Sequence, residues 1–297
     1  MSVAAFSPRT ISAVQQIRKM RGGSQSHLMR ADDGAFWIVK FRNNPQHFRV
    51  LANEFFASRI GSYLGLPVPE VAVIDVSEWL IEHTPEMRVD VAGRAVPCSC
   101  GLQLASRYIA NPQTDMVFDY LPESLMTKNR HIAEEVTRVL VLDKWTGNTD
   151  GRQAVFTKPA YARYYDISLI DQGYCFNAEQ SNFSDIALAG VYYRNFVYEH
   201  VTGWESFEPV LSRAEKMDSQ DLWKLAQGMP EEWWNREPWE KIQWSGAPVP
   251  QECWEKKFPT DLTKLIDTLV QRRSKIRDLI TAFRESSRNP FPRWVGN

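Results

Sequence analysis

Two aspartates near the middle of the chain have the surroundings that a phosphoryl-transfer site requires. Asp150 ends the loop Gly147-Asn148-Thr149-Asp150, which follows a long amphipathic segment, and Asp171 follows the apolar run 167–170 and precedes Gln172-Gly173. A short hairpin between them would bring the two carboxylates close together. One carboxylate can then orient or deprotonate a hydroxyl nucleophile, while the other holds Mg²⁺ on the phosphates of a nucleotide.

A triphosphate also needs backbone donors and a positive charge. Successive N–H groups of a glycine-containing loop can form an anion nest, and the loop Gly22-Gly23-Ser24-Gln25-Ser26 has this character. Lys40 lies within the apolar run 36–41, where a buried ammonium group needs a partner, and Glu54 further along is the natural one. A strand lysine paired with a helix glutamate is the arrangement with which kinases position phosphates.

The first third of the chain is predicted to form short strands with one helix. Asp32-Asp33-Gly34 between two apolar runs is a typical hairpin turn. Apolar residues at helical spacing predict a helix over 51–64, and the prolines within 66–69 end it. The predicted strands cover 27–31, 35–41, 70–76 and a hairpin over 88–96.

The remainder of the chain is predicted to be mainly helical. An apolar stripe predicts a helix over 131–147, and a further helix is expected over 262–286, whereas 163–176 has strand character. Strands with one helix, followed mostly by helices, predict two lobes around a cleft, where ligands usually bind. We therefore expect an α+β, bilobal fold with a small β-rich N-terminal lobe over 1–108 and a larger, mainly α-helical C-terminal lobe over 109–297.

The order of these motifs resembles that of the HipA-like kinases. The segment NEFFASRIGSYLGLPVPEV is similar to a HipA-type helix that ends in Gly-Leu-x-Val-Pro, and LDKWTGNTDGRQAVF resembles the HipA catalytic loop. The same loop is similar to those of phosphatidylinositol 4-kinases and of secretory-pathway kinases. The resemblance covers roughly residues 20–180 and implies a protein-kinase-like fold that uses ATP and Mg²⁺.

Carried over by position, the resemblance implies a role for each motif. Asp150 would orient or deprotonate the acceptor hydroxyl, most simply a Ser or Thr of a protein substrate, and Asp171 would bind the metal ion. Glu54 would hold Lys40 against the phosphates, the glycine-containing loop would cover them, and backbone atoms after the last N-terminal strand would read adenine. The residues implied to bind the nucleotide are Gly22, Gly23, Ser24, Gln25, Ser26, Lys40, Ser106, Tyr108 and Ile109.

One departure from the kinase pattern keeps alternative functions open. Kinases place an Asn a few residues after the catalytic Asp as a second metal ligand, but here that position is Val155, and Gln153 is the nearby oxygen ligand. This motivates a nucleotide-binding pseudokinase that serves as an interaction module. The similarity to phosphatidylinositol 4-kinases motivates a lipid or small-molecule kinase. Asp166 is an alternative to Asp171 as the metal aspartate.

The composition argues against several other classes of protein. Lys and Arg number 35 and Asp and Glu 36, so no global charge favours nucleic acid. The four cysteines lack zinc-site spacing and predict reduced, mostly buried thiols. No stretch approaches the ~18 apolar residues that a membrane helix needs, and the first 20 residues do not resemble a signal peptide. We expect a cytoplasmic protein without direct contact to membrane or nucleic acid.

Tryptophans concentrate in the C-terminal half. They could form an aromatic surface for a peptide or sugar, or they could pack the helical lobe, and the interleaved acidic residues favour packing. The residues concerned are Trp204, Trp223, Trp233, Trp234, Trp239, Trp244 and Trp254.

Overall fold

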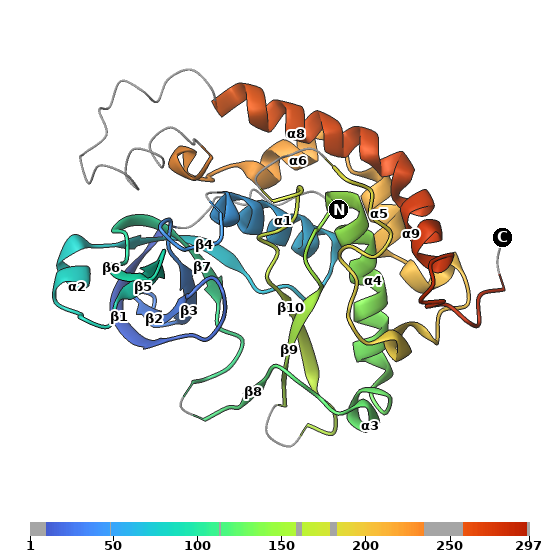
Figure 1. Ribbon diagram of the computed structural model, residues 1–297, viewed down its shortest axis with the longest axis horizontal. Helices are drawn as coiled ribbons and strands as arrows, with labels where there is room; N and C mark the ends of the chain where they lie inside the picture. Colours follow the sequence, from blue (N-terminus) through green and yellow to red (C-terminus); the bar gives the residue numbers. More distant parts are fainter. Residues whose placement is uncertain are drawn as a thin grey trace.

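The computed structural model describes residues 10–47, 49–112, 114–158, 162–178, 183–234 and 258–295. A closed β-barrel lies at one side of the molecule, helices cover the other side, and a small sheet lies between them (Figure 1). The predicted α+β architecture, with a strand-rich N-terminal part and a mainly helical C-terminal part, is confirmed. The division of the chain at residue 108 stays a prediction.

The barrel consists of five strands in the order β1-β2-β3-β7-β4, closed by parallel pairing of β1 with β4. Side chains alternate between its interior and its surface, because successive residues of a strand point to opposite faces. A separate hairpin, β5 with β6, and the short helix α2 (Glu78–Glu82) pack at its end. The strands are β1 (Thr10–Lys19), β2 (His27–Ala31), β3 (Phe36–Lys40), β4 (Val71–Val76), β5 (Arg88–Val91), β6 (Arg94–Pro97) and β7 (Gly101–Arg107).

Helix α1 (Val50–Leu64) is buried along almost its whole length because it lies between the barrel and the other helices. It ends at Gly65, whose φ of 87° is left-handed and therefore suits glycine. The amides of Gly65 and Leu66 donate to the carbonyls of Ser62 and Gly61, which satisfies the last turn of the helix. The predicted helix over 51–64 is thus confirmed, with its end where the prolines require it.

The C-terminal half combines helices with a three-stranded sheet in the order β10-β9-β8. Its strands are β8 (Val117–Phe118), β9 (Gln153–Thr157) and β10 (Asp166–Ile170). Its helices are α3 (Glu123–Met126), α4 (Arg130–Thr146), α5 (Val210–Lys216), α6 (Ser219–Ala226), α8 (Phe258–Arg272) and α9 (Ile276–Arg284). Four short 3-10 helices, Asn195–Tyr198, Trp204–Phe207, Glu231–Trp233 and Arg273–Lys275, complete the described elements.

Two of the predicted elements differ from the structure. The strand expected over 163–176 is only β10, because Asp171 adopts a left-handed φ of 62° that ends the extended backbone. The single helix expected over 262–286 is divided at Arg273–Lys275 by a 3-10 turn. Here the side chain of Arg273 donates to the carbonyl of Val270, in α8, and to that of Met217, just after α5. The 3-10 turn therefore also links α8 to the end of α5.

The apolar side chains form two separate cores. One fills the barrel and includes Trp37, Phe41 and Ile74. The other includes α1 together with α4, α8 and α9, so α1 packs with the helical half although it lies among the N-terminal strands in sequence. Helix α1 is therefore the element that joins the two halves.

The described tryptophans largely support the packing interpretation. Trp233 and Trp234 are buried, and Trp204 packs on the large core, whereas Trp223 is 39% exposed. Trp239, Trp244 and Trp254 lie outside the described residues. Within the described part of the chain, no helix has the length and apolar character needed to cross a membrane.

Candidate functional site

Lys40, at the end of β3, is the centre of a buried ionic cluster. Its Nζ donates to Glu54 of α1 and, at 2.9 Å, to Oδ1 of Asp171 just beyond β10. The predicted Lys40–Glu54 pair therefore forms, and Asp171 joins it from a distant part of the chain. Burial by itself lowers the pKa of Lys40, but the two carboxylates outweigh it and raise that pKa, so the ammonium form persists.

The two carboxylates of this cluster respond oppositely to their surroundings. Burial raises the pKa of Asp171, yet the Lys40 ammonium and its hydrogen bond outweigh burial, and the net pKa is lowered. Burial, with a smaller contribution from the Asp171 charge, keeps the pKa of Glu54 raised in spite of Lys40. One ammonium thus faces two acids, which leaves the cluster with excess negative charge whenever both acids are ionised.

Gln153 links the cluster to the loop Gly147–Asp150, the predicted catalytic loop. Its Nε2 donates to Oδ2 of Asp171 at 3.1 Å and to Oδ2 of Asp150 at 3.4 Å. The antiparallel pairing of β9 with β10 places Gln153 directly opposite Ile170, next to Asp171. Asp166 lies at the other end of β10 and is exposed. At the usual rise of an extended strand, the stretch from Asp166 to Asp171 spans about 16 Å. Of the two candidate aspartates, Asp171 is therefore the one that contacts Lys40.

Asp150 is exposed at the tip of the loop that follows α4. Gly147 ends the helix with a left-handed φ of 60°, and the backbone turns so that the amide of Asp150 donates to Oδ1 of Asn148 at 3.1 Å. Oδ1 of Asp150 accepts from the Gly151 amide at 2.7 Å. The carboxylate is thus oriented by its own loop while its outer face stays open to solvent.

A buried ion pair that sequence reasoning did not find supports this loop. Arg152 donates through Nε and Nη2 to both oxygens of Asp143 and through Nη1 to the carbonyl of Ile170 at 2.8 Å. Asn148 Nδ2 also donates to Asp143. These contacts tie the end of α4, the catalytic loop and the residue before Asp171 together. The sequence signal was an arginine within Gly-Asn-Thr-Asp-Gly-Arg, next to a helix whose last turn contains an aspartate.

Asn53, next to Glu54 on α1, is a second supporting residue that was missed. Its Nδ2 donates to the carbonyls of Gly173, Cys175 and Ala178 at 3.1, 2.9 and 2.8 Å. Three residues of this loop, 176–178, have positive φ angles without being glycine, a conformation that persists only when the surroundings enforce it. Helix α1 therefore positions both Lys40, through Glu54, and the loop after Asp171, through Asn53.

The glycine-containing loop is the turn between β1 and β2. Gly22 and Gly23 are exposed, whereas Ser26 is buried. Gln25 fixes the loop to the barrel and to β5, since its side chain forms hydrogen bonds with Lys19 and with the backbone of Asp90. Ser24 and Ser26 share a hydrogen bond of 3.2 Å between their hydroxyls. A role of Gly22 to Ser26 in covering phosphates stays a prediction.

The segment expected to read adenine is only partly available for that purpose. Ser106 lies within β7, paired with Ile38 of β3 and Val71 of β4, and the amide of Tyr108 donates to the carbonyl of Phe36 at 2.9 Å. The Tyr108 amide is therefore already used by the barrel. The carbonyl of Tyr108 and the backbone of Ile109 stay the candidates.

The donor set around Asp171 suits a hard divalent cation. The described residues contain no group of three or more His, Cys, Asp or Glu side chains placed to bind a metal ion. Mg²⁺, however, is commonly held by one or two protein oxygens, with phosphates and water completing its shell. Asp171 and the amide oxygen of Gln153 fit that pattern, since a half-turn of the Gln153 amide would present its oxygen in place of Nε2.

A sequence model described as HipA-like kinase matches residues 13–248, which include every element of this site. The chain belongs to the HipA-like kinase family. Membership of this family supports a phosphotransferase. It also confirms the resemblance to HipA-like kinases that the motifs indicated. Among curated proteins, no match is found.

Solved structures with kinase folds resemble this HipA-like kinase. A Helicobacter pylori proinflammatory kinase, CtkA, aligns with a TM-score of 0.53 at 15% identity, covering 94% of this chain and all of that one. The Golgi casein kinase with Mn/ADP bound aligns with a TM-score of 0.48 at 10% identity, covering 94% and 74%. HipA of Shewanella oneidensis MR-1, in complex with HipB and operator DNA, aligns with a TM-score of 0.47 at 11% identity, covering 91% and 68%.

Proposed function

We propose that this protein is an ATP-dependent kinase that transfers the γ-phosphate to a Ser or Thr hydroxyl of a protein. The observation that carries the proposal is the contact series from Glu54 through Lys40 and Asp171 to Gln153 and Asp150. This series connects an ammonium, a carboxylate beside it and a solvent-facing carboxylate, and phosphoryl transfer uses such a set of groups.

Each residue has a distinct task in this proposal. When bound, Mg²⁺ would neutralise charge on the phosphates, and Asp171 with Gln153 would hold it. Lys40, kept protonated by two carboxylates, would bind phosphate oxygens. Glu54 would hold the Lys40 side chain in place for this contact. Asp150 would accept the hydrogen bond of the acceptor hydroxyl and so orient the attacking oxygen.

The surroundings of Asp150 favour a protein acceptor over a small molecule. The carbonyl of Asp150 accepts from the amide of Gly190, which ties a further segment to the catalytic loop. That segment exposes large apolar side chains nearby in sequence, with Ile186 at 58% and Tyr193 at 63% exposure. Exposed apolar side chains on a segment that is bonded to Asp150 support a surface that contacts a macromolecule.

The direct test uses labelled ATP, Mg²⁺ and a mixture of candidate protein acceptors. We expect the wild type to label protein, or itself, on serine or threonine, and Asp150→Asn to lower the rate at least ~100-fold while ATP binding persists. Asp166→Asn is the matched control, because Asp166 is an exposed aspartate at the far end of β10. Equal rates for the wild type and Asp150→Asn would refute the assignment of Asp150.

A nucleotide-binding pseudokinase is the second candidate, and one observation favours it. Val155 occupies the position of the usual metal-binding Asn within β9, and Gln153, a neutral residue, takes its place beside Asp171. This alternative predicts that ATP and Mg²⁺ raise the melting temperature without any transfer of label. Label found in lipid or metabolite fractions but not in protein would instead support a lipid or small-molecule kinase.

A further inference from the structure

The C-terminal end of α4, where the catalytic loop begins, is closed by residues from distant parts of the chain. The last carbonyls of a helix have no partner within the helix and need external donors. Here the amides of Phe176 and Asn177 donate to the carbonyls of Thr146 and Gly147 at 2.7 and 3.2 Å. The loop after Asp171 thus supplies part of the cap.

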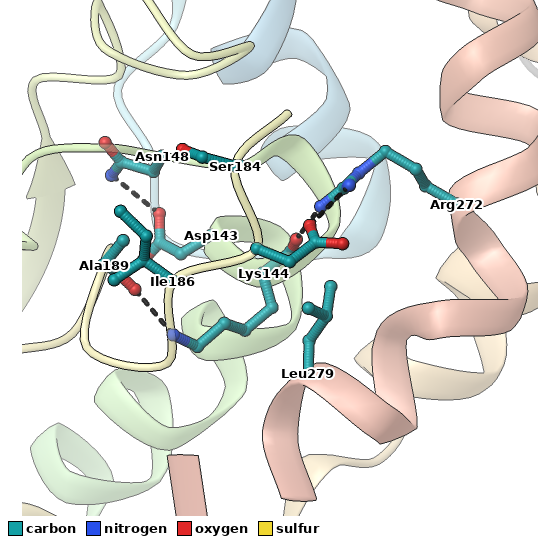
Figure 2. A pocket seen from close by; sticks show the side chains of 10 residues that line it. Asp143, Lys144, Asn148, Ser184, Ile186, Ala189, Arg272 and Leu279 are labelled. Atoms are coloured by element: carbon teal, nitrogen blue, oxygen red, sulfur yellow. Dashed lines mark hydrogen bonds and ion pairs between the residues drawn. The ribbon is translucent and has the colours of Figure 1, made fainter. Parts of the chain in front are cut away.

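Arg272, the last residue of α8, supplies the rest of the cap. Its Nη2 donates to the carbonyl of Lys144 at 3.0 Å, and its Nε donates to the carbonyl of Trp145 at 2.9 Å. Only 5% of Arg272 is exposed, and Figure 2 shows its side chain reaching from its helix to the end of α4. A cation at a helix C-terminus also interacts favourably with the helix dipole.

The same guanidinium anchors the segment that follows residue 182. Its Nη1 donates to Oδ1 of Asp185 at 2.7 Å, and its planar group lies 4.2 Å from the centre of the Phe183 ring. Phe183 in turn packs on Gly147, where an added Cβ would lie 2.7 Å from the ring. Arg272 therefore contacts α4 directly and contacts the first residue of the catalytic loop through Phe183.

The anchored segment continues to Asp150. Lys144 Nζ donates to the carbonyls of Ala187 and Ala189 at 2.7 and 2.6 Å, and the amide of Gly190 donates to the carbonyl of Asp150 at 3.1 Å. Figure 2 shows the bond between Lys144 and Ala189, both of which line a small pocket together with Arg272. A displacement at Asp185 would therefore be transmitted along this segment to the backbone of Asp150.

Arg272 lies outside the part of the chain that the family match covers, which ends at residue 248. Every acceptor it binds, however, lies in or beside the matched catalytic region. Arginine suits this task because its rigid, planar group donates in three directions at once, which a lysine ammonium on a single atom cannot reproduce.

We propose that Arg272 is a positioning residue for phosphoryl transfer, acting through the end of α4 and through Asp185 to set the position of Asp150. This inference rests on the proposed function, because it assigns Arg272 to the same reaction. It places helix α8 among the elements on which the catalytic loop depends.

The test compares Arg272→Met, Arg272→Lys and Asp185→Asn with the wild type. The matched control is Arg277→Met, which removes an arginine from the neighbouring helix α9 whose ion pair is with Glu215, at 2.7 Å. Single-turnover transfer is measured per ATP-bound site, with the number of sites taken from an ATP titration. A role in folding alone would change the number of sites and leave the rate per site unchanged.

We expect Arg272→Met to lower the rate per site at least tenfold, Arg272→Lys to fail to restore it, and Asp185→Asn to give a smaller loss. Hydrogen exchange at the amides of Phe176 and Gly190 should become faster in both Arg272 variants. A rate per site within twofold of Arg277→Met, or full rescue by Arg272→Lys, would overturn the proposal. If Arg272→Met does not fold, Arg272→Lys and Asp185→Asn decide by the same criteria.

The failure of the proposed function has a different signature. If the wild type binds ATP but transfers no phosphate to any acceptor, the kinase proposal fails, whereas hydrogen exchange still reports whether Arg272 fixes the catalytic loop. Unchanged exchange at Gly190 in all Arg272 variants would overturn the positioning role on its own.

Discussion

Two ionic clusters lie near the loop Gly147–Asp150, and they are built differently. The side chains of Asp143 and Arg152 are wholly buried, and both oxygens of Asp143 accept bonds from Arg152. In the other cluster, Lys40 faces both Glu54 and Asp171, and the side chain of Asp171 is 17% exposed. The first cluster is balanced in charge and closed, whereas the second has an excess of acid and is open.

The difference supports a reactive role for the open cluster and a supporting role for the closed one. In the closed pair, both carboxylate oxygens already accept hydrogen bonds, so neither is free to bind a cation. The pair instead fixes the two segments that it joins. An open cluster with an extra carboxylate attracts a cation and keeps an ammonium in place for phosphates. The comparison therefore separates residues that set geometry, Asp143 and Arg152, from residues proposed to meet the nucleotide, Lys40 and Asp171.

The largest expected effect is on the closed pair. Arg152→Met leaves the Asp143 carboxylate buried without its cation, so the free energy of unfolding should fall by about 3–5 kcal/mol. Urea denaturation of the wild type and the variant measures this change. Arg130→Met is the matched control, since the side chains of Arg130 and its partner Glu134 are 80% and 30% exposed, and it should cost about 1 kcal/mol or less. A loss below ~1 kcal/mol in Arg152→Met would show that the pair does not support the fold.

The barrel contains a further buried ionisable group, the imidazole of His27, and unlike in the two clusters no carboxylate of the described residues forms an ion pair with it. Burial, with a smaller effect of the Lys19 ammonium, lowers the pKa of His27 from 6.5 to about 4. Below pH 6.5 the unfolded chain takes up a proton that the folded protein refuses until about pH 4. The contribution of His27 to the free energy of unfolding is therefore fully present above pH 6.5, and it declines by ~3 kcal/mol as the pH falls to 4.

The measurement is the free energy of unfolding between pH 7.5 and 4 for the wild type and His27→Phe. The variant should lose this part of the pH dependence, whereas His83→Phe, which replaces an exposed histidine, should retain it. Parallel pH curves for the wild type and His27→Phe would contradict the prediction.

The smallest expected effect concerns the open cluster and its cation. A ligand at one hundred times its dissociation constant stabilises a folded protein by about 2.7 kcal/mol. ATP with Mg²⁺ should therefore raise the melting temperature of the wild type, and Asp171→Asn should abolish the part that depends on Mg²⁺. Asp166→Asn should behave like the wild type. An equal Mg²⁺-dependent shift in Asp171→Asn would mean that the metal ion is held elsewhere.

The local elements were predictable because their patterns are short and periodic. The strands β2 and β3, helix α1 and helix α4 follow the spacing of their apolar residues closely. Strand β1 was not predicted, and the reason is visible in its pairing with β2. Register shifts between Ala13 and Gln15 and between Gln16 and Arg18 interrupt the alternation that would have revealed it.

The order of Lys40, Glu54, Asp150 and Asp171 in the sequence led to the proposed chemistry, because kinases use a strand lysine, a helix glutamate and two aspartates in this order. The pairing of Lys40 with Glu54 followed from the same order, since a buried ammonium needs a nearby acid.

Only the tertiary structure decided which groups hold these residues in place. The closure of Asp143 by Arg152, the three carbonyls that Asn53 gathers and the reach of Arg272 to the end of α4 have no periodic signature. Contacts between Arg272 and Trp145, or between Asn53 and Gly173, form only when distant segments pack together. Sequence spacing therefore specified the groups that are proposed to react, and long-range packing specified the contacts that orient them.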